Sequence, residues 1–195
     1  MEEAYDPLDY ENLARSVVTA LLAREPEPLP PANAVTGAGV YAIYYQGRFK
    51  AYEKISKSTY QSPIYVGKAI PAGGRKGQPG VTPATGNELY KRLKEHAQSI
   101  KQTENLSLGD FTCRYLVVLP VWVSLAEQFL INHYHPIWNL VLDGFGNHDP
   151  GAGRKDMRRP HWDIVHPGRP WAGKLTAEEK LEDLLAEVKS FLEVK

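Results

Sequence analysis

Hydrophobic residues recur at helical spacing in four segments of the chain. In residues 9–25, Leu13, Val17 and Leu21 lie about one turn apart, as in an amphipathic helix whose apolar face packs on a core. Asn87 opens another such segment and is a favourable N-cap residue. We expect helices over residues 9–25, 87–100, 124–135 and 176–195.

Three short segments are instead dense in β-branched and aromatic residues, the composition of buried strands. They are GVYAIYY (39–45), PIYVGKA (63–69) and FTCRYLVVLPV (111–121). Four prolines in EPEPLPPAN favour an extended linker after the first helix, and a Gly/Pro-rich loop occupies residues 71–86. The order of elements predicts one small mixed α/β domain over residues 1–195, with an extra helix at each end.

Length and composition limit the class of protein. With 195 residues, of which 43% are hydrophobic, the chain can bury the core of one ordinary domain. The single cysteine, Cys113, excludes an internal disulfide framework and a Cys-rich zinc site and fits a reducing compartment. The acidic start MEEAYDPLDY shows no signal peptide, and the most apolar segment, residues 115–126, is too short to span a membrane. We therefore expect a soluble intracellular protein.

Charge is balanced overall, with 23 basic and 23 acidic residues, but unevenly distributed. Residues 1–38 hold two basic and seven acidic side chains, residues 39–175 hold 18 and 10, and residues 176–195 hold three and six. A basic middle between acidic ends favours a polyanionic partner that docks on the middle.

Two predicted strands place a tyrosine close to a glycine. Tyr41 follows Gly39 by two residues, and Tyr65 precedes Gly67 by two. A strand tyrosine ordinarily packs in a core. A glycine nearby removes bulk, however, and lets a ligand or backbone reach the ring hydroxyl, so both roles stay open.

The two central helices carry candidate catalytic groups. Arg92 and His96, four residues apart, share one helix face, where they form either a phosphate-binding and proton-transferring pair or an ordinary solvated face. Glu127 stands in an otherwise apolar stretch. It either completes a capping box with Ser124 as the N-cap or holds a divalent cation such as Mg²⁺. His133 and His135 are two apart and diverge on a helix, which disfavours zinc binding.

In this order, the elements resemble the GIY-YIG nuclease domain. The resemblance covers residues 37–140 and rests on GVY (39–41), YVG (65–67), a helix with Arg92, a helix with Glu127, and PIWN (136–139). His96 and GFGNHDPG (144–151) resemble the type II restriction endonucleases that cut the palindrome CCGCGG. The long interval between the tyrosine motifs and the two end helices depart from compact members, and no zinc finger or helix-hairpin-helix module is visible.

The resemblance implies a fold and roles for individual residues. The implied fold is a three-stranded antiparallel sheet flanked by helices. Residues 1–36 would form the N-terminal helix and linker, residues 37–140 the catalytic core, and residues 141–195 the DNA-contacting loop and C-terminal helix. Residues of the core would then hydrolyse a phosphodiester bond. By this resemblance, Tyr41 would be the general base and His96 would accept its proton. Tyr65 would orient the water or the phosphate, Arg92 would stabilise negative charge, and Lys68 would contact a phosphate. Asn139 would position the site, and Glu127 would bind one Mg²⁺ or Mn²⁺.

DNA contacts outside the catalytic residues are expected in two basic stretches. These are the loop with Arg75 and Lys76 and the run with Arg154, Lys155, Arg158 and Arg159. Arginine reads guanine in the major groove, which suits a GC-rich site. A palindromic site implies a homodimer. We also expect the protein to act in the cytoplasm of a prokaryotic host, with no membrane partner and no organic cofactor. A nicking nuclease of homing or repair type and a non-catalytic DNA-binding protein are the alternatives.

Overall fold

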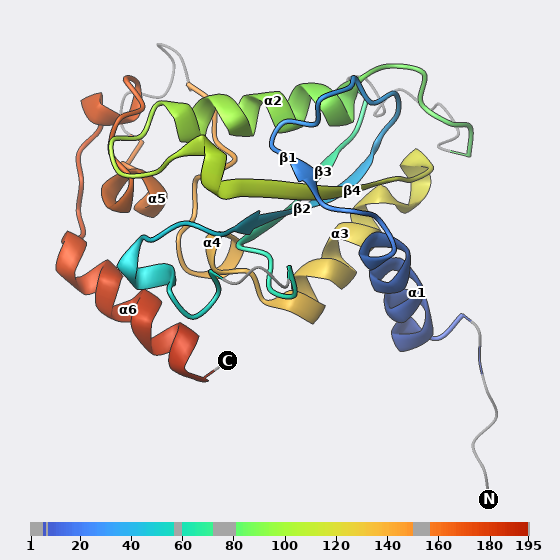
Figure 1. The fold of residues 1–195 in the computed structure, drawn as a ribbon, viewed down its shortest axis with the longest axis horizontal. Coiled ribbons are helices and arrows are strands. Elements are labelled where there is room, and N and C mark those ends of the chain that lie inside the picture. The colour runs from blue at the N-terminus through green and yellow to red at the C-terminus, as the bar shows by residue number, and fades with distance from the viewer. Residues whose placement is uncertain (1–5, 7, 57–59, 72–80, 150–156, 195) are drawn as a thin grey trace, which may run out of the picture.

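The computed structural model describes residues 6, 8–56, 60–71, 81–149 and 157–194 (Figure 1). The helices in that part of the chain are α1 (Tyr10–Leu22), α2 (Glu88–Lys101), α3 (Pro120–Tyr134), α4 (Ile137–Leu140), α5 (His161–Val165) and α6 (Leu181–Val194). The strands are β1 (Glu27–Pro28), β2 (Gly39–Tyr45), β3 (Tyr65–Ala69) and β4 (Phe111–Val117). Short 3-10 turns lie at Lys50–Tyr52, Leu108–Asp110 and Ala172–Lys174.

The four strands form one antiparallel sheet in the order β1-β4-β2-β3. The expected antiparallel sheet flanked by helices is thus confirmed, and β1 adds a fourth strand to the three predicted. This extra strand comes from the proline-rich linker, where Glu27 pairs with Cys113 and Pro28 with Thr112. Pro28 is tolerated because β1 is at the sheet edge, where one side of the strand needs no hydrogen-bond donor.

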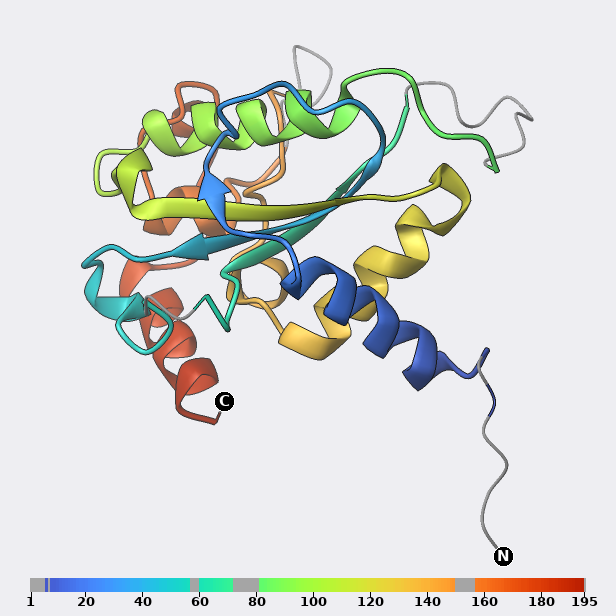
Figure 2. The same ribbon diagram turned by 45° about the vertical axis from the view of Figure 1, so that its right-hand side comes forward.

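Strand β2 lies in the centre of the sheet, and all seven of its residues are buried. Its side chains alternate between two cores, as period two requires. Tyr41, Ile43 and Tyr45 belong to the core that contains residues of α2, and Val40 and Ala42 to the core that contains residues of α1 and α3. The helices accordingly cover opposite faces, with α2 on one side and α1 and α3 on the other (Figures 1 and 2).

The C-terminal third of the chain extends the first of these cores. Trp138 and Trp162 are fully buried there beside Phe145, and α6 contributes Leu184 and Val188. This packing brings the segment after α4 against α2 and β3, which is how residues distant in sequence reach the candidate site described below.

The largest correction to the predicted elements concerns α3. The strand before it ends at Val117, not at residue 121, and the helix begins at Pro120, four residues before Ser124. Proline suits the first helical position because its fixed φ matches the helix and its missing N–H would be unpaired there. Ser124 is therefore not an N-cap, and Glu127 is not part of a capping box.

Other boundaries shift by smaller amounts. The helix predicted over residues 176–195 begins at Leu181, and that predicted over 9–25 spans Tyr10–Leu22. Asn87 occupies the N-cap position of α2 as predicted, but its side chain makes no capping hydrogen bond. Pro136 follows the end of α3, where His135 adopts a left-handed conformation.

Within the described residues, none of the helices is long and apolar enough to cross a bilayer. Cys113 is a free, buried thiol in β4, and burial raises its pKa to about 12. A thiol of such a high pKa is almost entirely protonated at neutral pH and is a poor nucleophile. Cys113 therefore belongs to the core and not to a reactive site.

Candidate active site

A cleft of about 540 Å³ opens between α2, β3 and α3. It brings together five of the residues that the sequence singled out, Tyr41, Tyr65, Lys68, Arg92 and Glu127. Ala69, Ile70, Glu88, Lys91 and Glu95 complete its lining. Residues from four separate elements thus meet around one cleft, and Tyr41, the residue from β2, is itself fully buried at its inner wall.

Tyr41 and His96 form a buried pair behind this cleft. The Oη atom of Tyr41 lies 2.6 Å from Nε2 of His96, and both side chains are almost fully buried. Gly67 pairs directly with Tyr41 across the sheet, and a Cβ atom at Gly67 would overlap the Tyr41 phenol. Gly67 therefore makes room for the phenol of Tyr41 on the neighbouring strand, whereas the sequence pattern predicted room for a ligand or backbone. His96 belongs to the buried face of α2 and not to a solvated face.

Burial determines the ionisation of this pair. It raises the pKa of the Tyr41 phenol well above 10, an effect that the nearby Tyr65 increases and Arg92 opposes. Burial also lowers the pKa of His96 well below 6.5, and the positive charge of Arg92 acts in the same direction. Both groups are neutral at pH 7. With the ring proton of His96 on Nδ1, Nε2 accepts a hydrogen bond from the Tyr41 hydroxyl.

Tyr65 extends the pair toward the cleft. Its ring centroid lies 6.3 Å from that of Tyr41 and 5.1 Å from that of His96. Burial raises the pKa of Tyr65, although the charge of Arg92 opposes the rise. Tyr65 is thus a neutral hydroxyl group in the cleft lining, next to the Tyr41–His96 pair.

Arg92 is held in place by three groups. Its Nη2 donates to the Gly146 carbonyl at 2.7 Å, and its Nη1 donates to Glu95 at 3.0 Å and to Nε2 of His148. The side chain is 22% exposed, so the guanidinium borders the cleft and still contacts solvent. Gly146 and His148 come from the segment after α4, more than 50 residues further along the chain.

Glu127 lies in the middle of α3, beyond its first turn, and its side chain lines the cleft. Its Oε2 atom is 2.7 Å from Nζ of Lys68. The Glu127 side chain is 17% exposed and the Lys68 side chain is 37% exposed. Because Glu127 does not belong to a capping box, its role is not to cap the helix, and its carboxylate instead pairs with Lys68. No cluster of three or more metal-ligating side chains occurs among the described residues. A single carboxylate at a cleft nevertheless fits Mg²⁺, which is commonly held by one or two carboxylates together with waters and substrate phosphate.

Asn139 lies outside the cleft lining and contacts the backbone of β3. Its Oδ1 accepts from the Val66 N–H and its Nδ2 donates to the Val66 carbonyl, both at 2.8 Å. Val66 stands between Tyr65 and Gly67, so this side chain holds the segment that carries both. The expected positioning role of Asn139 agrees with this geometry.

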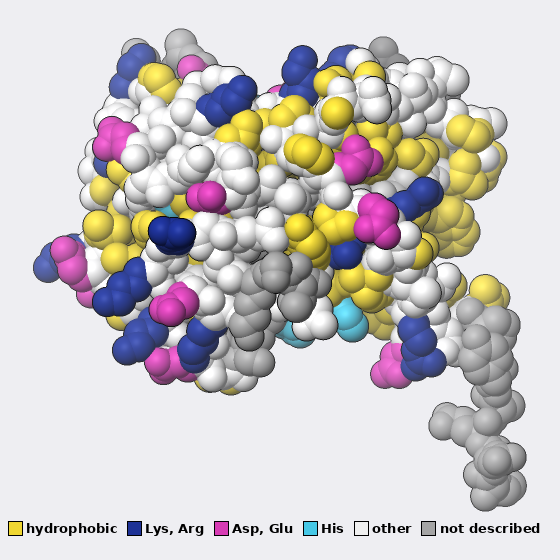
Figure 3. All heavy atoms as spheres, viewed as in Figure 1, with side chains coloured by type: hydrophobic (Ala, Val, Ile, Leu, Met, Phe, Trp, Pro, Cys, Tyr) yellow, Lys and Arg dark blue, Asp and Glu magenta, His cyan; other side chains and the backbone are white. Residues whose placement is uncertain are grey.

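The residues predicted to contact DNA away from the cleft fall into two groups. Arg75, Lys76, Arg154 and Lys155 lie outside the described residues. Arg158 is 75% exposed and pairs with Glu178 at 2.7 Å, whereas Arg159 donates to the carbonyls of Ala172 and Gly173. On the face in Figure 3, basic and acidic side chains are interspersed, and no extended area of one sign appears.

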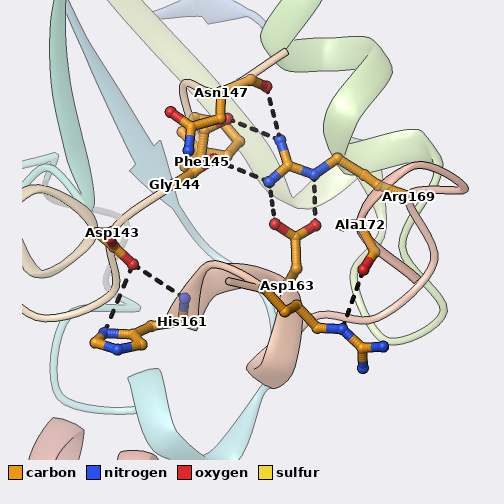
Figure 4. Close-up of polar contacts among 9 residues, drawn as sticks. Asp143, Gly144, Phe145, Asn147, His161, Asp163, Arg169 and Ala172 are labelled. Carbon is orange, nitrogen blue, oxygen red and sulfur yellow. Dashed lines mark hydrogen bonds and ion pairs between the residues drawn. The ribbon is translucent and has the colours of Figure 1, made fainter. Parts of the chain in front are cut away.

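The sequence placed residues 144–148 in the DNA-contacting region after residue 140 and marked the run GFGNHDPG only as a resemblance to restriction endonucleases. In the structure, Gly146 and His148 bind Arg92, and the Phe145 ring stacks on His96 at 4.5 Å with an angle of 17° between the planes. Arg169 and Asp163, which hold this segment from its other side, were missed as well (Figure 4). The only sequence signal for such contacts was the glycine-rich run itself.

A four-stranded antiparallel sheet with Tyr41, Tyr65, Arg92 and Glu127 around one cleft and His96 behind it is consistent with the fold of a GIY-YIG nuclease. The protein-family model described as the Eco29kI GIY-YIG domain matches residues 33–192 of the sequence, which is most of the chain. This chain therefore belongs to the Eco29kI GIY-YIG family of restriction endonucleases, a membership that implies DNA as the substrate. No curated protein matches the chain.

Proposed function

We propose that this protein is a type II restriction endonuclease that hydrolyses both strands of double-stranded DNA at a short GC-rich palindrome. CCGCGG is the candidate site, because the matched family bears the name of Eco29kI, which recognises it. Mg²⁺, or Mn²⁺ in its place, would be required. The observation that carries the proposal is the hydrogen bond between Tyr41 and His96 behind a cleft that also presents Arg92 and Glu127.

In this mechanism Tyr41 is the general base. A phenol is a weak base at pH 7 unless its own proton has an acceptor, and neutral His96 supplies one at 2.6 Å. As Tyr41 takes a proton from the attacking water, its Oη–H proton passes to Nε2 of His96. This relay needs no preformed phenolate, which agrees with the raised pKa of Tyr41. The lowered pKa of His96 disfavours the imidazolium, so the ring would hold the proton only while the water attacks.

Glu127 is the residue that would hold Mg²⁺. When bound, the ion supplies positive charge at the scissile phosphate and at the leaving 3′ oxygen. The Glu127 carboxylate borders the cleft, and it is already neutralised by a cation, Lys68. The carboxylate is an oxygen donor of the type that Mg²⁺ prefers, and Lys68 would leave it for a phosphate oxygen when the ion binds.

Three further side chains would act on the phosphate. Arg92 would stabilise negative charge on the non-bridging oxygens through its planar fork of donors. Tyr65 would orient the water or the phosphate, and Lys68 would contact a phosphate oxygen. Asn139 would keep Tyr65 in register by holding Val66.

The expected DNA contacts complete this proposal. Arg75, Lys76, Arg154, Lys155, Arg158 and Arg159 are the candidate groups, in two basic stretches that would reach the backbone or a groove. A palindromic site implies a homodimer that places one active site on each strand. We place this activity in the cytoplasm of a prokaryotic host.

Plasmid cleavage tests the function directly. The protein is incubated with supercoiled plasmid and Mg²⁺, and the ends of the products are sequenced. Discrete linear fragments with one common end sequence are expected. Nicked circles would instead indicate the monomeric nicking nuclease, and an unchanged plasmid with retained binding would indicate a non-catalytic DNA-binding protein.

A further inference from the structure

The segment over residues 144–148 is fixed by one buried arginine, Arg169 (Figure 4). Nη1 of Arg169 donates to the carbonyls of Phe145 at 3.2 Å and Asn147 at 3.1 Å, and Nη2 donates to the Gly144 carbonyl at 2.8 Å. Three carbonyls within four residues therefore converge on one guanidinium. Such an arrangement sets the path of the backbone.

Asp163 neutralises this guanidinium. Nε of Arg169 donates to Oδ1 of Asp163 at 2.6 Å, and Nη2 donates to Oδ2. Both side chains are at most 2% exposed. Arginine carries five N–H donors, and all five have an acceptor here. Lysine, with three donors on one atom, cannot reproduce this fork.

The same five-residue segment contacts the candidate catalytic residues with its remaining groups. The Gly146 carbonyl and the His148 ring bind Arg92, and the Phe145 ring stacks on His96. The segment therefore has two sides. Three of its carbonyls bind Arg169, whereas the Gly146 carbonyl and the side chains of Phe145 and His148 contact Arg92 or His96.

We propose that Arg169, with Asp163 as its counter-ion, is a positioning residue for the active site, because it sets the backbone of residues 144–148 that hold Arg92 and His96. The proposal rests on the proposed nuclease function. A buried ion pair adds little net stability and is often replaced by apolar residues without loss. A contribution to stability alone therefore does not account for a guanidinium shared among three loop carbonyls.

Arg169→Lys tests this role, since it keeps the charge for Asp163 and removes the fork. In single-turnover cleavage of a short duplex at saturating enzyme, we expect the rate to fall by about 10²-fold, the effect of misplacing catalytic groups by about 1 Å. The Kd for the duplex, measured without a divalent cation, should change much less than the rate.

An NMR signal gives a readout that stability alone does not move. In the wild type, the stacked Phe145 ring shifts the His96 ring protons upfield, and this ring-current shift should diminish in Arg169→Lys. Arg114→Lys is the matched control. Arg114 also donates to loop carbonyls, those of Arg24 and Tyr60, but near Tyr44 in the core on the opposite face of the sheet. This control should keep both the cleavage rate and the His96 signal.

A folded Arg169→Lys protein with the wild-type rate and an unchanged His96 signal would overturn the proposal. If Arg169→Lys does not fold, the double variant Asp163→Leu/Arg169→Met removes the clamp and both charges together, and a wild-type rate in that variant would overturn it equally. If the wild type itself cleaves no DNA, the nuclease function fails, and the His96 signal still decides whether Arg169 positions this segment.

Discussion

Asn139 gives Val66 the two hydrogen bonds that a further strand would otherwise provide. Strand β3 lies at the edge of the sheet, and the Asn139 side chain both accepts from and donates to the Val66 backbone. An edge strand that carries two site residues is thereby fixed on its outer side, where no strand pairs with it.

Asn139→Ala should lower both stability and activity. Two partly buried backbone groups lose their partners, which costs about 1–3 kcal/mol of unfolding free energy for each group left unsatisfied. The single-turnover cleavage rate should fall while DNA affinity is retained, because Tyr65 moves with β3. Urea unfolding and cleavage of a short duplex measure the two effects. An unchanged rate at reduced stability would assign Asn139 to the fold alone.

Glu127→Gln should abolish cleavage and leave specific DNA binding largely intact. The change removes the charge that would bind Mg²⁺ and nearly preserves the shape of the side chain. Lys68 loses its ion partner and gains freedom to contact phosphate, so affinity should not fall. Cleavage assays with Mg²⁺ and electrophoretic mobility shifts without it measure both. A Gln variant that cuts at a near wild-type rate would exclude Glu127 as the metal ligand.

His96→Ala and Tyr41→Phe should differ in their dependence on pH. In the wild type, the lowered pKa of His96 keeps the ring neutral from pH 6 upward, so its protonation should not limit the rate there. In His96→Ala, only ionised Tyr41 can act as the base. Because burial raises its pKa well above 10, the phenolate fraction should rise about tenfold per pH unit across pH 6–10 without reaching a plateau.

Tyr41→Phe has no phenol to ionise and should lack this slope. Its single-turnover rate should be about 10²–10⁴-fold below wild type. It also leaves the buried Nε2 of His96 without its hydrogen-bond partner, which should cost about 1–3 kcal/mol of stability. Equal slopes for the two variants, or a fully active Tyr41→Phe, would remove Tyr41 from the mechanism and favour a hydroxide as the nucleophile.

DNA affinity should fall steeply with salt although the net charge is zero. Each phosphate that is neutralised contributes about −0.9 to the slope of log K against log salt concentration. The basic middle of the chain, with 18 basic and 10 acidic residues, should provide several such contacts in each protomer. Fluorescence anisotropy across a salt series measures the slope. A flat dependence would contradict a docking surface on residues 39–175.

Stability should fall on acidification because His166 is buried and neutral. Its Nε2 atom lies 2.6 Å from the Tyr52 hydroxyl and its Nδ1 atom 2.9 Å from Oδ1 of Asn105, and burial lowers its pKa to about 3. Below pH 6.5 the unfolded chain takes up a proton there and the folded protein does not. This difference costs about 1.4 kcal/mol per pH unit as the pH falls toward 3.

His166→Gln should remove that part of the pH dependence, since glutamine does not titrate. Urea unfolding at pH 7 and pH 5 on both proteins gives the comparison. His96 contributes in the same direction and is present in both, so the difference between the proteins isolates His166. Parallel pH profiles would mean that His166 is protonated in the folded state or contributes nothing.

The sequence by itself determined most of the secondary structure and five of the residues that line the cleft, Tyr41, Tyr65, Lys68, Arg92 and Glu127. Strand and helix patterns depend on neighbours within a few residues, so the periodicity placed β2, β3 and α2 almost correctly. It failed at the start of α3, because Pro120 can end a strand or begin a helix and only packing decides between them. It also missed β1, whose two residues pair with Cys113 and Thr112 far along the chain.

Only the tertiary structure decided how the site is held together. His96 was ambiguous in sequence because a helix position becomes buried or solvated according to what packs against it, and β2 buries it beside Tyr41. Phe145, Gly146 and His148 reach Arg92 and His96 across more than 45 residues of chain, and Arg169 binds carbonyls of the same segment from more than 20 residues further along. Contacts over such distances depend on the packing of the whole core and leave no spacing in the sequence that could predict them.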